Sequence, residues 1–566
     1  IPAISAQVDA LSGGEYSKIL DRAAAKASAK GETPRNFNSG AQEVWDRYAA
    51  KAREAAGERE WGKPEFYTVQ SGADANYADA KPPTRAKCVP VGVGGPRFRG
   101  APQWHFLHYG YLELPSPMKS GGQYDVTLKD GRRVSFLYDE MRTVSRAIKV
   151  NQVGYLADSA HKYAYVGAHF YGLGPLSIAN ESRFKVVDAA TGKSVLEGPV
   201  TLRSEDIKAN ARNGESELGL YGERIYEIDL GELKTEGVFF ISVPGVGRSW
   251  PFANGASTYG EVFYTSTRGL YHQRCGIAYE EPYTQWKRVR CHTTPVFECD
   301  LVAFGIGNFD RPEDLDRFDV VGATTDRSRS TKDVVGGWHD AADWDRNNAH
   351  YINIYDLLYA YEIRPGAFAD GQLNIPESGN GIPDVLDEAE FGLAVWTKSM
   401  TPQGGVSGTV ETWTHPSLNA DVDYAFSRRT RWDSLNYAAA AAQLALHLGS
   451  FDASRSARYR ELAERAFGFG SDPANSLGRI TINAKKGRGK GAAYSVNWEE
   501  KDDYIRPYLL HAKSRLFLLT NDRKYLDGIE ELAPACPPPS TFPYGFRTIW
   551  PWIFYSLARN EPKIVS

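Results

Sequence analysis

The sequence changes its periodicity near residue 259, and this change restricts the chain to a multidomain architecture. From about residue 61 to that point, short apolar runs are separated by Gly and Pro, a pattern typical of β-strands. After it, apolar residues recur at helical spacing over long segments. The 566 residues also exceed the size at which one hydrophobic core stops growing. We therefore expect several domains, with β-rich domains first and a helical domain last.

The region 259–566 predicts a domain of paired helices. Its segments alternate in character, which favours a barrel of inner and outer helices, an (α/α) barrel. One segment carries Pro383 in its first turn, where the missing N–H costs nothing. The predicted helices cover residues 263–274, 352–363, 382–399, 432–448, 455–469, 499–519, 524–532 and 547–559.

The region 1–60 is rich in Ala, Lys, Arg and Glu and predicts a helical N-terminal segment. Its two expected helices span residues 15–29 and 41–57, and a mobile arm is the alternative. We expect these helices to pack on a neighbouring domain.

Two β-domains are expected between this segment and the helical domain. In the first, residues 61–145, an Asp-Gly pair at Asp130 lies between strand patterns and predicts a hairpin. In the second, residues 146–258, short strand patterns and turns recur at the spacing of a β-sandwich. We assign a β-sandwich to each region.

Charge and cysteine content narrow the class of protein. Sixty-six basic and seventy acidic residues leave a net charge of −4. This charge gives no electrostatic reason to expect binding to nucleic acid or to an anionic membrane. No apolar run approaches the roughly 18 residues that span a bilayer. Five cysteines are too few for a disulfide scaffold. A neutral substrate fits this composition best.

The stretch 336–346 (GGWHDAADWDR) concentrates the groups that carry chemistry. Inverting hydrolysis of a glycosidic bond requires a carboxylate that deprotonates a water and a second carboxyl group that protonates the leaving oxygen. Asp340 and Asp343 are three positions apart and can hold the same water. Trp338 and Trp344 suit the apolar face of a sugar. The alternative is an Asp-rich entry to a helix, in which an aspartate caps the first turn.

Three ordered motifs resemble those of glycoside hydrolase family 9. The stretch 336–343 resembles its Gly-Gly-Trp-(Tyr/His)-Asp-Ala-Gly-Asp signature, with Ala342 where the family usually has glycine. The stretch 380–389 (NGIPDVLDEA) is similar to the start of a family helix, and the stretch 148–155 (IKVNQVGY) to the opening of its immunoglobulin-like module. The resemblance implies an immunoglobulin-like second β-domain and a six-hairpin barrel.

The resemblance implies an inverting glycoside hydrolase that cleaves β-1,4-linked glucan or its oligosaccharides. Asp343 would be the general base, and Asp340 would orient the same water. A secreted, periplasmic or cell-surface location follows from that substrate. Two alternatives stay open: an exo-acting enzyme of this fold with another specificity, such as a glucosaminidase, and a non-catalytic carbohydrate-binding protein. Further expected sugar contacts are Trp413, His415, Trp432 and Tyr504.

Two cation sites are considered. Some family members hold a structural zinc with two cysteines and two histidines, and the matching positions here are Cys275, Cys291, His292 and His339. A disulfide from Cys291 to Cys275 or Cys299 is the alternative. Calcium is a weaker expectation, at the alternating oxygen ligands Asn419, Asp421 and Asp423.

The family's general acid, a glutamate late in the barrel, has no matching motif before Ser566. Glu499 and Glu500 lie beside an indole but several helices too early, where they suit the start of a helix, and Glu411 near Trp413 is a loop candidate. We expect the chain to be the N-terminal part of a precursor and the barrel to be incomplete at its C-terminus. The C-terminal fragment would remain docked as a second chain and supply the glutamate.

Overall fold

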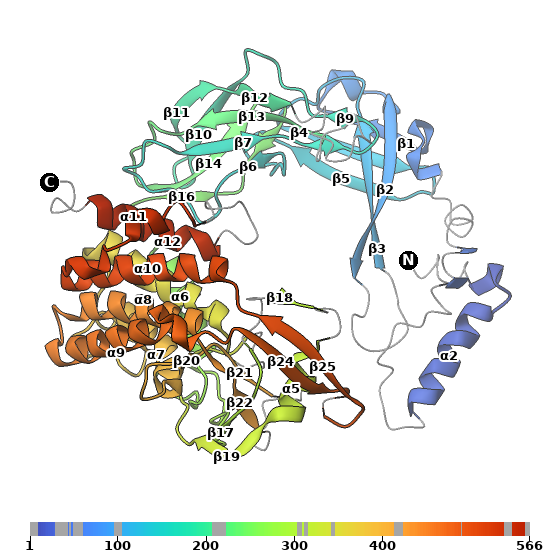
Figure 1. Cartoon of the computed structure of the whole chain (residues 1–566). Helices are drawn as coiled ribbons and strands as arrows, with labels where there is room; N and C mark the ends of the chain where they lie inside the picture. Colours follow the sequence, from blue (N-terminus) through green and yellow to red (C-terminus); the bar gives the residue numbers. More distant parts are fainter. Residues whose placement is uncertain are drawn as a thin grey trace. The chain divides into compact units, whose positions relative to one another are not determined.

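The computed structural model divides the chain into two compact units, residues 1–262 and 263–566, and each is described by itself. Figure 1 shows the elements with their labels. The described residues are 9–28, 43–44, 47–48, 60–94, 105–205, 222–302, 308–310, 315–340, 346–412, 423–487, 489–536 and 546–560.

The first unit begins with one of the two expected helices, α2 (Glu15–Ser28). The other, residues 41–57, lies largely outside the described residues. An antiparallel sheet follows in the order β1-β4-β5, formed by β1 (Tyr67–Gln70), β4 (Gly122–Leu128) and β5 (Arg133–Tyr138).

The first β-domain differs from the expected sandwich. The described residues form the three-stranded sheet and a separate hairpin of β2 (Arg85–Gly94) and β3 (His105–Glu113). Asp130 and Gly131 connect β4 to β5, as the hairpin pattern predicts, with Gly131 at a φ of 87°. Most of β5 is exposed, and Val134 keeps 57% of its surface accessible. Within the described residues of this domain, no second sheet packs on the three-stranded sheet to form a sandwich.

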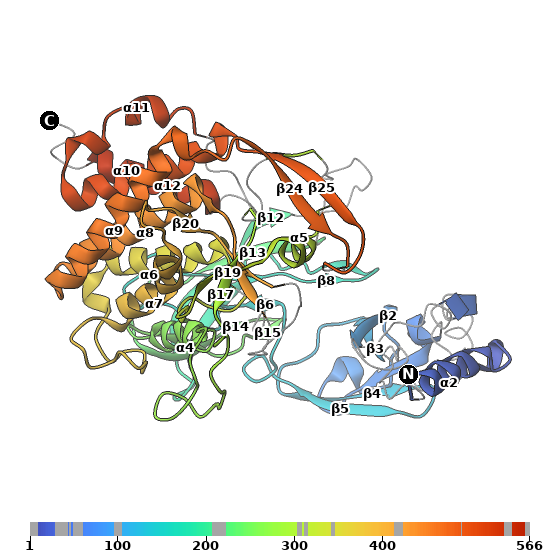
Figure 2. The same cartoon turned by 60° about the horizontal axis from the view of Figure 1, so that its bottom comes forward.

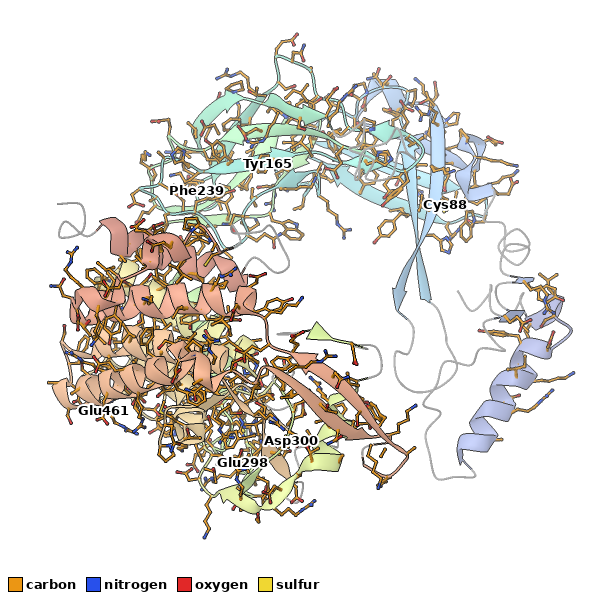
Figure 3. The ribbon with its side chains drawn as sticks, viewed as in Figure 1. Cys88, Tyr165, Phe239, Glu298, Asp300 and Glu461 are labelled. Carbon is orange, nitrogen blue, oxygen red and sulfur yellow. The ribbon has the colours of Figure 1, made fainter. Side chains whose placement is uncertain are left out.

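The second β-domain is a sandwich of two antiparallel sheets. One sheet has the order β11-β10-β14-β15, with β16 also paired to β14, and the other has the order β12-β13-β7-β6. Phe239, labelled in Figure 3, is fully buried together with Val186 and Ile228, which come from both sheets. The strands are β6 (Ile148–Lys149), β7 (Tyr163–Val166), β10 (Arg183–Asp188), β11 (Ser194–Pro199), β12 (Thr201–Glu205), β13 (Arg224–Asp229), β14 (Gly237–Val243), β15 (Gly247–Arg248) and β16 (Phe252–Asn254). A small ribbon of β8 (His169–Phe170) and β9 (Gly174–Pro175) completes this domain.

The second unit is organised around one buried helix, α8 (Arg431–Leu448). It contacts α6, α7, α9 and α10, as Figure 1 shows. The run Ala438–Ala442 is fully buried, because a helix that neighbours enclose on all sides requires small side chains where they approach closely. Thr430 caps its N-terminus by accepting a hydrogen bond from the Asp433 amide.

Most of the other helices lie where the helical periodicity places them, but α5 was not predicted and only Ile529–Leu532 of the expected helix 524–532 is α-helical. Charged residues cover the outer side of α9, and Figure 3 labels exposed Glu461 there. The helices are α4 (Gly260–Tyr271), α5 (Arg317–Thr324), α6 (Tyr351–Ile363), α7 (Asp384–Ser399), α9 (Ala453–Ser471), α10 (Asp502–Thr520), α11 (Ile529–Leu532) and α12 (Phe546–Asn560). Within the described residues, no helix combines the length and apolar character needed to cross a membrane.

The second unit also contains strands that the helical pattern did not predict. A long hairpin of β24 (Arg479–Lys485) and β25 (Ala493–Glu499) extends away from the helices α8 to α10 in Figures 1 and 2. It pairs with β18 (Asn308–Phe309). A four-stranded sheet has the order β19-β17-β22-β21, from β17 (Val296–Glu298), β19 (Asp326–Thr331), β21 (Val410–Glu411) and β22 (Tyr424–Phe426). The pair β20 (Val406–Ser407) and β23 (Arg429–Thr430) leads into α8.

Candidate active site and metal centre

The structure describes both ends of the stretch 336–346, which we call the aspartate loop, up to Asp340 and again from Arg346. The expected base Asp343 and the expected sugar contact Trp344 lie outside the described residues. Trp413 and His415 lie outside them as well, so their assigned roles stay predictions.

Two glycines bring the aspartate loop against helix α7. Gly336 and Gly337 have φ angles of 129° and 72°, which L-residues with side chains rarely adopt. A Cβ atom at Gly336 would lie 2.7 Å from Ala394 Cβ, and one at Gly337 would lie 2.9 Å from Val395 Cγ1. Both the backbone conformation and the close approach to α7 therefore require glycine at these positions.

The segment before Asp340 pairs with the residues that follow helix α4. His339 N donates to Gln273 O at 2.7 Å, and Cys275 N donates to Gly337 O at 2.9 Å. Gly337 N donates to Phe391 O of α7 at 2.8 Å. These backbone contacts fix the path of the chain up to the residue that precedes Asp340.

Trp338 is a core residue here, in contrast to the expected sugar contact. Only 1% of its surface is accessible. Its indole Nε1 donates to Glu388 Oε1 at 2.8 Å, and its ring packs where Gly392 leaves room on α7. Burial under α7 removes both faces of this ring from solvent, so it cannot stack on a sugar.

Trp432 is likewise buried, whereas Tyr504 is partly exposed. Trp432 is fully buried and packs against Trp498 with ring centroids 5.7 Å apart. Its place in α8 explains this difference from the expectation, since α8 is enclosed by other helices. Tyr504 keeps 40% of its surface accessible on α10 and is available for a contact.

A buried ion network lies beneath the aspartate loop. Arg274 is 1% exposed and donates to both carboxylate oxygens of Glu377 at 3.0 Å and to Glu388 at 3.1 and 3.2 Å. Glu388 is fully buried and also accepts from Trp338. The sequence motif that starts α7 therefore supplies the carboxylate that holds the aspartate loop from below.

Arg346 closes the neck of the aspartate loop. Its side chain is fully buried, and Nη1 donates to Val334 O at 2.6 Å and to Gly336 O at 3.3 Å. Its own carbonyl accepts from Val410 N at 2.9 Å and from Thr409 Oγ1 at 3.1 Å. The Arg346 side chain thus links Val334 and Gly336, just before and at the start of the aspartate loop, to the residue that ends it.

Four side chains, one of them His339 next to Asp340, converge in the arrangement of a metal centre. Cys275, Cys291, His292 and His339 are all buried, and their ligand atoms lie within 4.8 Å of one another. Cys275 Sγ is 2.9 Å from His292 Nδ1, and Cys291 Sγ is 3.2 Å from His339 Nε2.

The donor set of this cluster fits a tetrahedral metal ion. Contact with Cys275, aided by the two histidines, holds the pKa of the Cys291 thiol far below its ordinary range although burial opposes this. Two sulfur and two imidazole donors match the preference of zinc. All five cysteines are described, and none forms a disulfide. The alternative disulfides are therefore not present.

Asp340 is exposed at the end of this fastened segment. Its carboxylate Oδ2 accepts a hydrogen bond from Asn347 Nδ2 at 2.9 Å. The contacts below it hold its backbone, while its carboxylate faces solvent. Exposure on a fixed backbone is the arrangement needed by a carboxylate that holds a reactant water.

The remaining candidates from the sequence are engaged elsewhere or not described. Glu411 is buried and pairs with Arg317 at 3.2 Å, and Glu500 is buried and pairs with Arg431 at 3.3 Å. These ion pairs remove both glutamates from contact with a sugar. For calcium, Asn419 and Asp421 are outside the described residues, and Asp423 accepts from Arg327 at 2.7 Å.

Arg274, Arg346, Asn347 and Glu388 were not identified from the sequence. The adjacency of Arg346 and Asn347 to the aspartate motif, and of Glu388 to the α7 motif, was the available signal. Arg274 had a weaker one, its position next to Cys275.

Comparison with known proteins identifies the family of this site. A model described as Glycosyl hydrolase family 9 matches residues 259–549, and one described as the cellulase N-terminal ig-like domain matches residues 143–248. The first match covers more than half of the chain and contains the aspartate loop and the metal cluster. The chain belongs to glycosyl hydrolase family 9, with an immunoglobulin-like domain before an α/α-barrel domain.

The curated relatives are longer proteins. A cellulose 1,4-beta-cellobiosidase of Acetivibrio thermocellus is 27% identical over 487 residues, which cover 81% of this chain and 48% of that protein. Endoglucanase C of Cellulomonas fimi is 27% identical over 400 residues, which cover 68% of this chain and 32% of that protein. The chain thus spans half the length of these relatives or less.

Solved structures share the fold. A metagenome-derived glycoside hydrolase family 9 endoglucanase matches with a TM-score of 0.54 and 27% identity, covering 72% of this chain and 67% of that one. A Zn-binding triple mutant of the family 9 endoglucanase J30 matches with a TM-score of 0.52 and 20% identity, covering 71% and 69%. At that identity the second match supports the fold alone.

Proposed function

We propose that this protein is an inverting glycoside hydrolase that cleaves β-1,4-linked glucan or glucan oligosaccharides. The observation that carries the proposal is Asp340, an exposed carboxylate on a segment that buried groups fasten from below. That segment lies in the region matched by the family model. The named activities of the relatives, cellobiosidase and endoglucanase, support this substrate class.

In this proposal Asp343 is the general base. It takes a proton from a water that attacks the anomeric carbon, while Asp340 accepts that water's other hydrogen and orients it. The reaction also needs a carboxylic acid on the other face of the sugar, to protonate the leaving oxygen. A polymeric substrate of this kind is consistent with a secreted, periplasmic or cell-surface protein.

We further propose that the cluster of Cys275, Cys291, His292 and His339 holds a structural zinc ion. A zinc ion there would contribute no reaction step and would act as a cross-link between chain segments. Among the described residues, the buried His292 Nε2 has no hydrogen-bond partner, and the Nδ1 of the same ring faces Cys275 Sγ. Because His339 directly precedes Asp340, a metal ion held by the cluster would fix the backbone next to that carboxylate.

Two measurements test the proposed reaction. Asp343→Ala should lower kcat by about 10²- to 10⁴-fold, the usual contribution of a general base. Proton NMR of a cellooligosaccharide digest should show the α-anomer of the new reducing end before mutarotation. A loss below about tenfold would remove Asp343 as the base, and a β-anomer would exclude inversion.

A substrate panel separates the proposed specificity from its alternatives. Release of sugars from β-glucan but not from xylan or chitosan oligomers supports a β-1,4-glucanase. Activity on chitosan oligomers alone supports the glucosaminide alternative. Binding to glucan without product supports a carbohydrate-binding protein.

A further inference from the structure

Asn347 is the residue that contacts the Asp340 carboxylate. Its Nδ2 donates to Asp340 Oδ2 at 2.9 Å across seven sequence positions. Within the part of the chain that the structure describes, this is the single hydrogen bond to that carboxylate. The contact joins the two described sides of the aspartate loop, one residue beyond the neck formed by Arg346.

The orientation of the Asn347 amide follows from its two partners. Its Oδ1 accepts from Ala349 N at 2.9 Å and caps the short helix η5 (Asn348–His350). A backbone N–H requires an acceptor, and a carboxylate accepts hydrogen bonds. Reversing the amide would place nitrogen against the amide of Ala349 and oxygen against Asp340. Both contacts therefore require the donor to face Asp340.

The neighbours of Asn347 hold its backbone from both sides. Arg346 is fixed through its buried guanidinium and through the bonds its carbonyl accepts from the 409–410 segment. Asn348 Nδ2 donates to Asp433 Oδ1 at 2.9 Å, and Asp433 is fully buried at the start of α8. Asn347 is thus a donor on a rigid support, which lets it dictate where Asp340 points.

We propose that Asn347 is a positioning residue that sets the orientation of the Asp340 carboxylate. The inference rests on the proposed function, since it assigns a role in the same reaction. The bond to Oδ2 fixes the plane of the carboxylate and leaves Oδ1 to accept a hydrogen from the water of the proposed reaction. Asn347 acts through Asp340 and makes no contact with sugar in this assignment, so its loss should change turnover and leave substrate affinity intact.

Two substitutions separate this role from the helix cap. Asn347→Asp keeps the capping oxygen and replaces the donor by a second carboxylate oxygen at Asp340. Asn347→Ser keeps a good N-cap but is one atom too short to bridge to Asp340. In the complete natural protein, kcat on a cellooligosaccharide should fall about 100-fold in the first variant and about tenfold in the second, the scale of a misplaced catalytic group. KM should stay within twofold of the wild-type value. The melting temperature should stay within about 3 °C of that of the wild type.

Asn380 provides the matched control. Its Nδ2 donates to the Asp387 carboxylate at 3.0 Å, and its Oδ1 accepts from Ile382 N at 2.8 Å, so it makes the same pair of bonds outside the aspartate loop. Asn380→Asp should leave kcat within twofold of the wild type per folded molecule. A similar fall in kcat in this control would assign the loss at Asn347 to general destabilisation and would overturn the proposal.

The outcomes distinguish this inference from the proposed function. A wild type that hydrolyses glucan, with kcat within threefold in both Asn347 variants, overturns the positioning role alone. A fall in kcat that is matched by a rise in KM and a lower melting temperature also overturns it. A wild type without hydrolase activity removes both, because no reaction would then depend on Asp340. If Asn347→Asp does not fold, the kcat of Asn347→Ser decides the question.

Discussion

The aspartate loop is held from two sides by groups of different chemistry. On one side, Arg274 pairs with the carboxylates of Glu377 and Glu388, so the chain itself supplies both the cation and the anions. On the other, Cys275, Cys291, His292 and His339 bring four ligand atoms within 4.8 Å of one another. The ion network is formed by side chains of the chain alone, whereas the proposed role of the cysteine–histidine cluster requires a bound cation. The support from the ion network therefore needs no added ion, whereas the support proposed for the cluster would vary with the supply of metal ion.

The largest effect should come from breaking the ion network. Glu388→Ala would leave the fully buried Arg274 with Glu377 alone and the Trp338 indole without its acceptor. Removing one partner of a buried pair typically costs about 3–5 kcal/mol. Urea unfolding should show this loss.

Glu461→Ala, on the exposed side of α9, is the control and should change stability by less than about 0.5 kcal/mol. A loss below about 1 kcal/mol in Glu388→Ala would mean that the network contributes little to stability.

The next effect should come from emptying the metal cluster. A chelator, or Cys291→Ser, should lower glucan hydrolysis about 10- to 100-fold, the usual scale for groups that orient a reactive residue through a metal. Added zinc should restore activity after chelation. Cys299→Ser is a matched control, because Cys299 is also buried but lies outside the cluster and donates to Phe426 O. Unchanged activity in metal-free protein would show that the ion network suffices alone.

A smaller loss of stability should follow from removing the hydrogen bond that Trp338 donates to Glu388. Trp338→Phe keeps a ring against Gly392 and removes the Nε1 donor to Glu388. A hydrogen bond to a charged group contributes about 1.5–3 kcal/mol. A double-mutant cycle with Glu388→Gln should show coupling between the two sites. Additive losses would contradict the contact.

The smallest effect is a dependence of stability on pH at Asp387, one residue before Glu388. Burial raises the pKa of Asp387 to about 6, although Arg455 and Asn380 favour the charged form. Because the folded state then holds a proton that the unfolded state has released, stability should fall as pH rises from about 4 to about 6. The slope reaches at most about 1.4 kcal/mol per pH unit. In Asp387→Asn, the urea midpoint should change less with pH between about 4 and about 6. The same pH dependence in this variant and the wild type would contradict the raised pKa of Asp387.

Much of the helical unit was predictable because its signal is local. The buried alanines of α8 and the proline at the start of α7 mark helices through residues close in sequence. The β24–β25 hairpin was missed although its alternating residues flank a Gly-rich turn at 487–491. Its short runs lie between strong helices, and that context favoured a continued helical pattern.

The candidate site was predictable only where a motif spans it. Asp340, His339 and the paired Cys291 and His292 are carried by short motifs. The partnership of Arg274 with Glu388 joins residues 114 positions apart. No local periodicity reports such a pair, since it forms only when α7 packs beneath the aspartate loop. The double role of Asn347 likewise depends on atoms that meet only in the folded chain.

The neck formed by Arg346 has a consequence for how this site can evolve. Joining the two ends of a short loop removes most of its chain entropy before any ligand arrives. The free-energy cost of ordering this part of the loop is then met when the chain folds, and substrate binding does not have to overcome it again. The hydrogen-bond partners of Arg346 are Val334, Gly336, Thr409 and Val410, so substitutions between Asp340 and Arg346 remove none of these partners. Evolution can therefore alter positions of this stretch that take no part in the proposed reaction while the frame that holds Asp340 is kept.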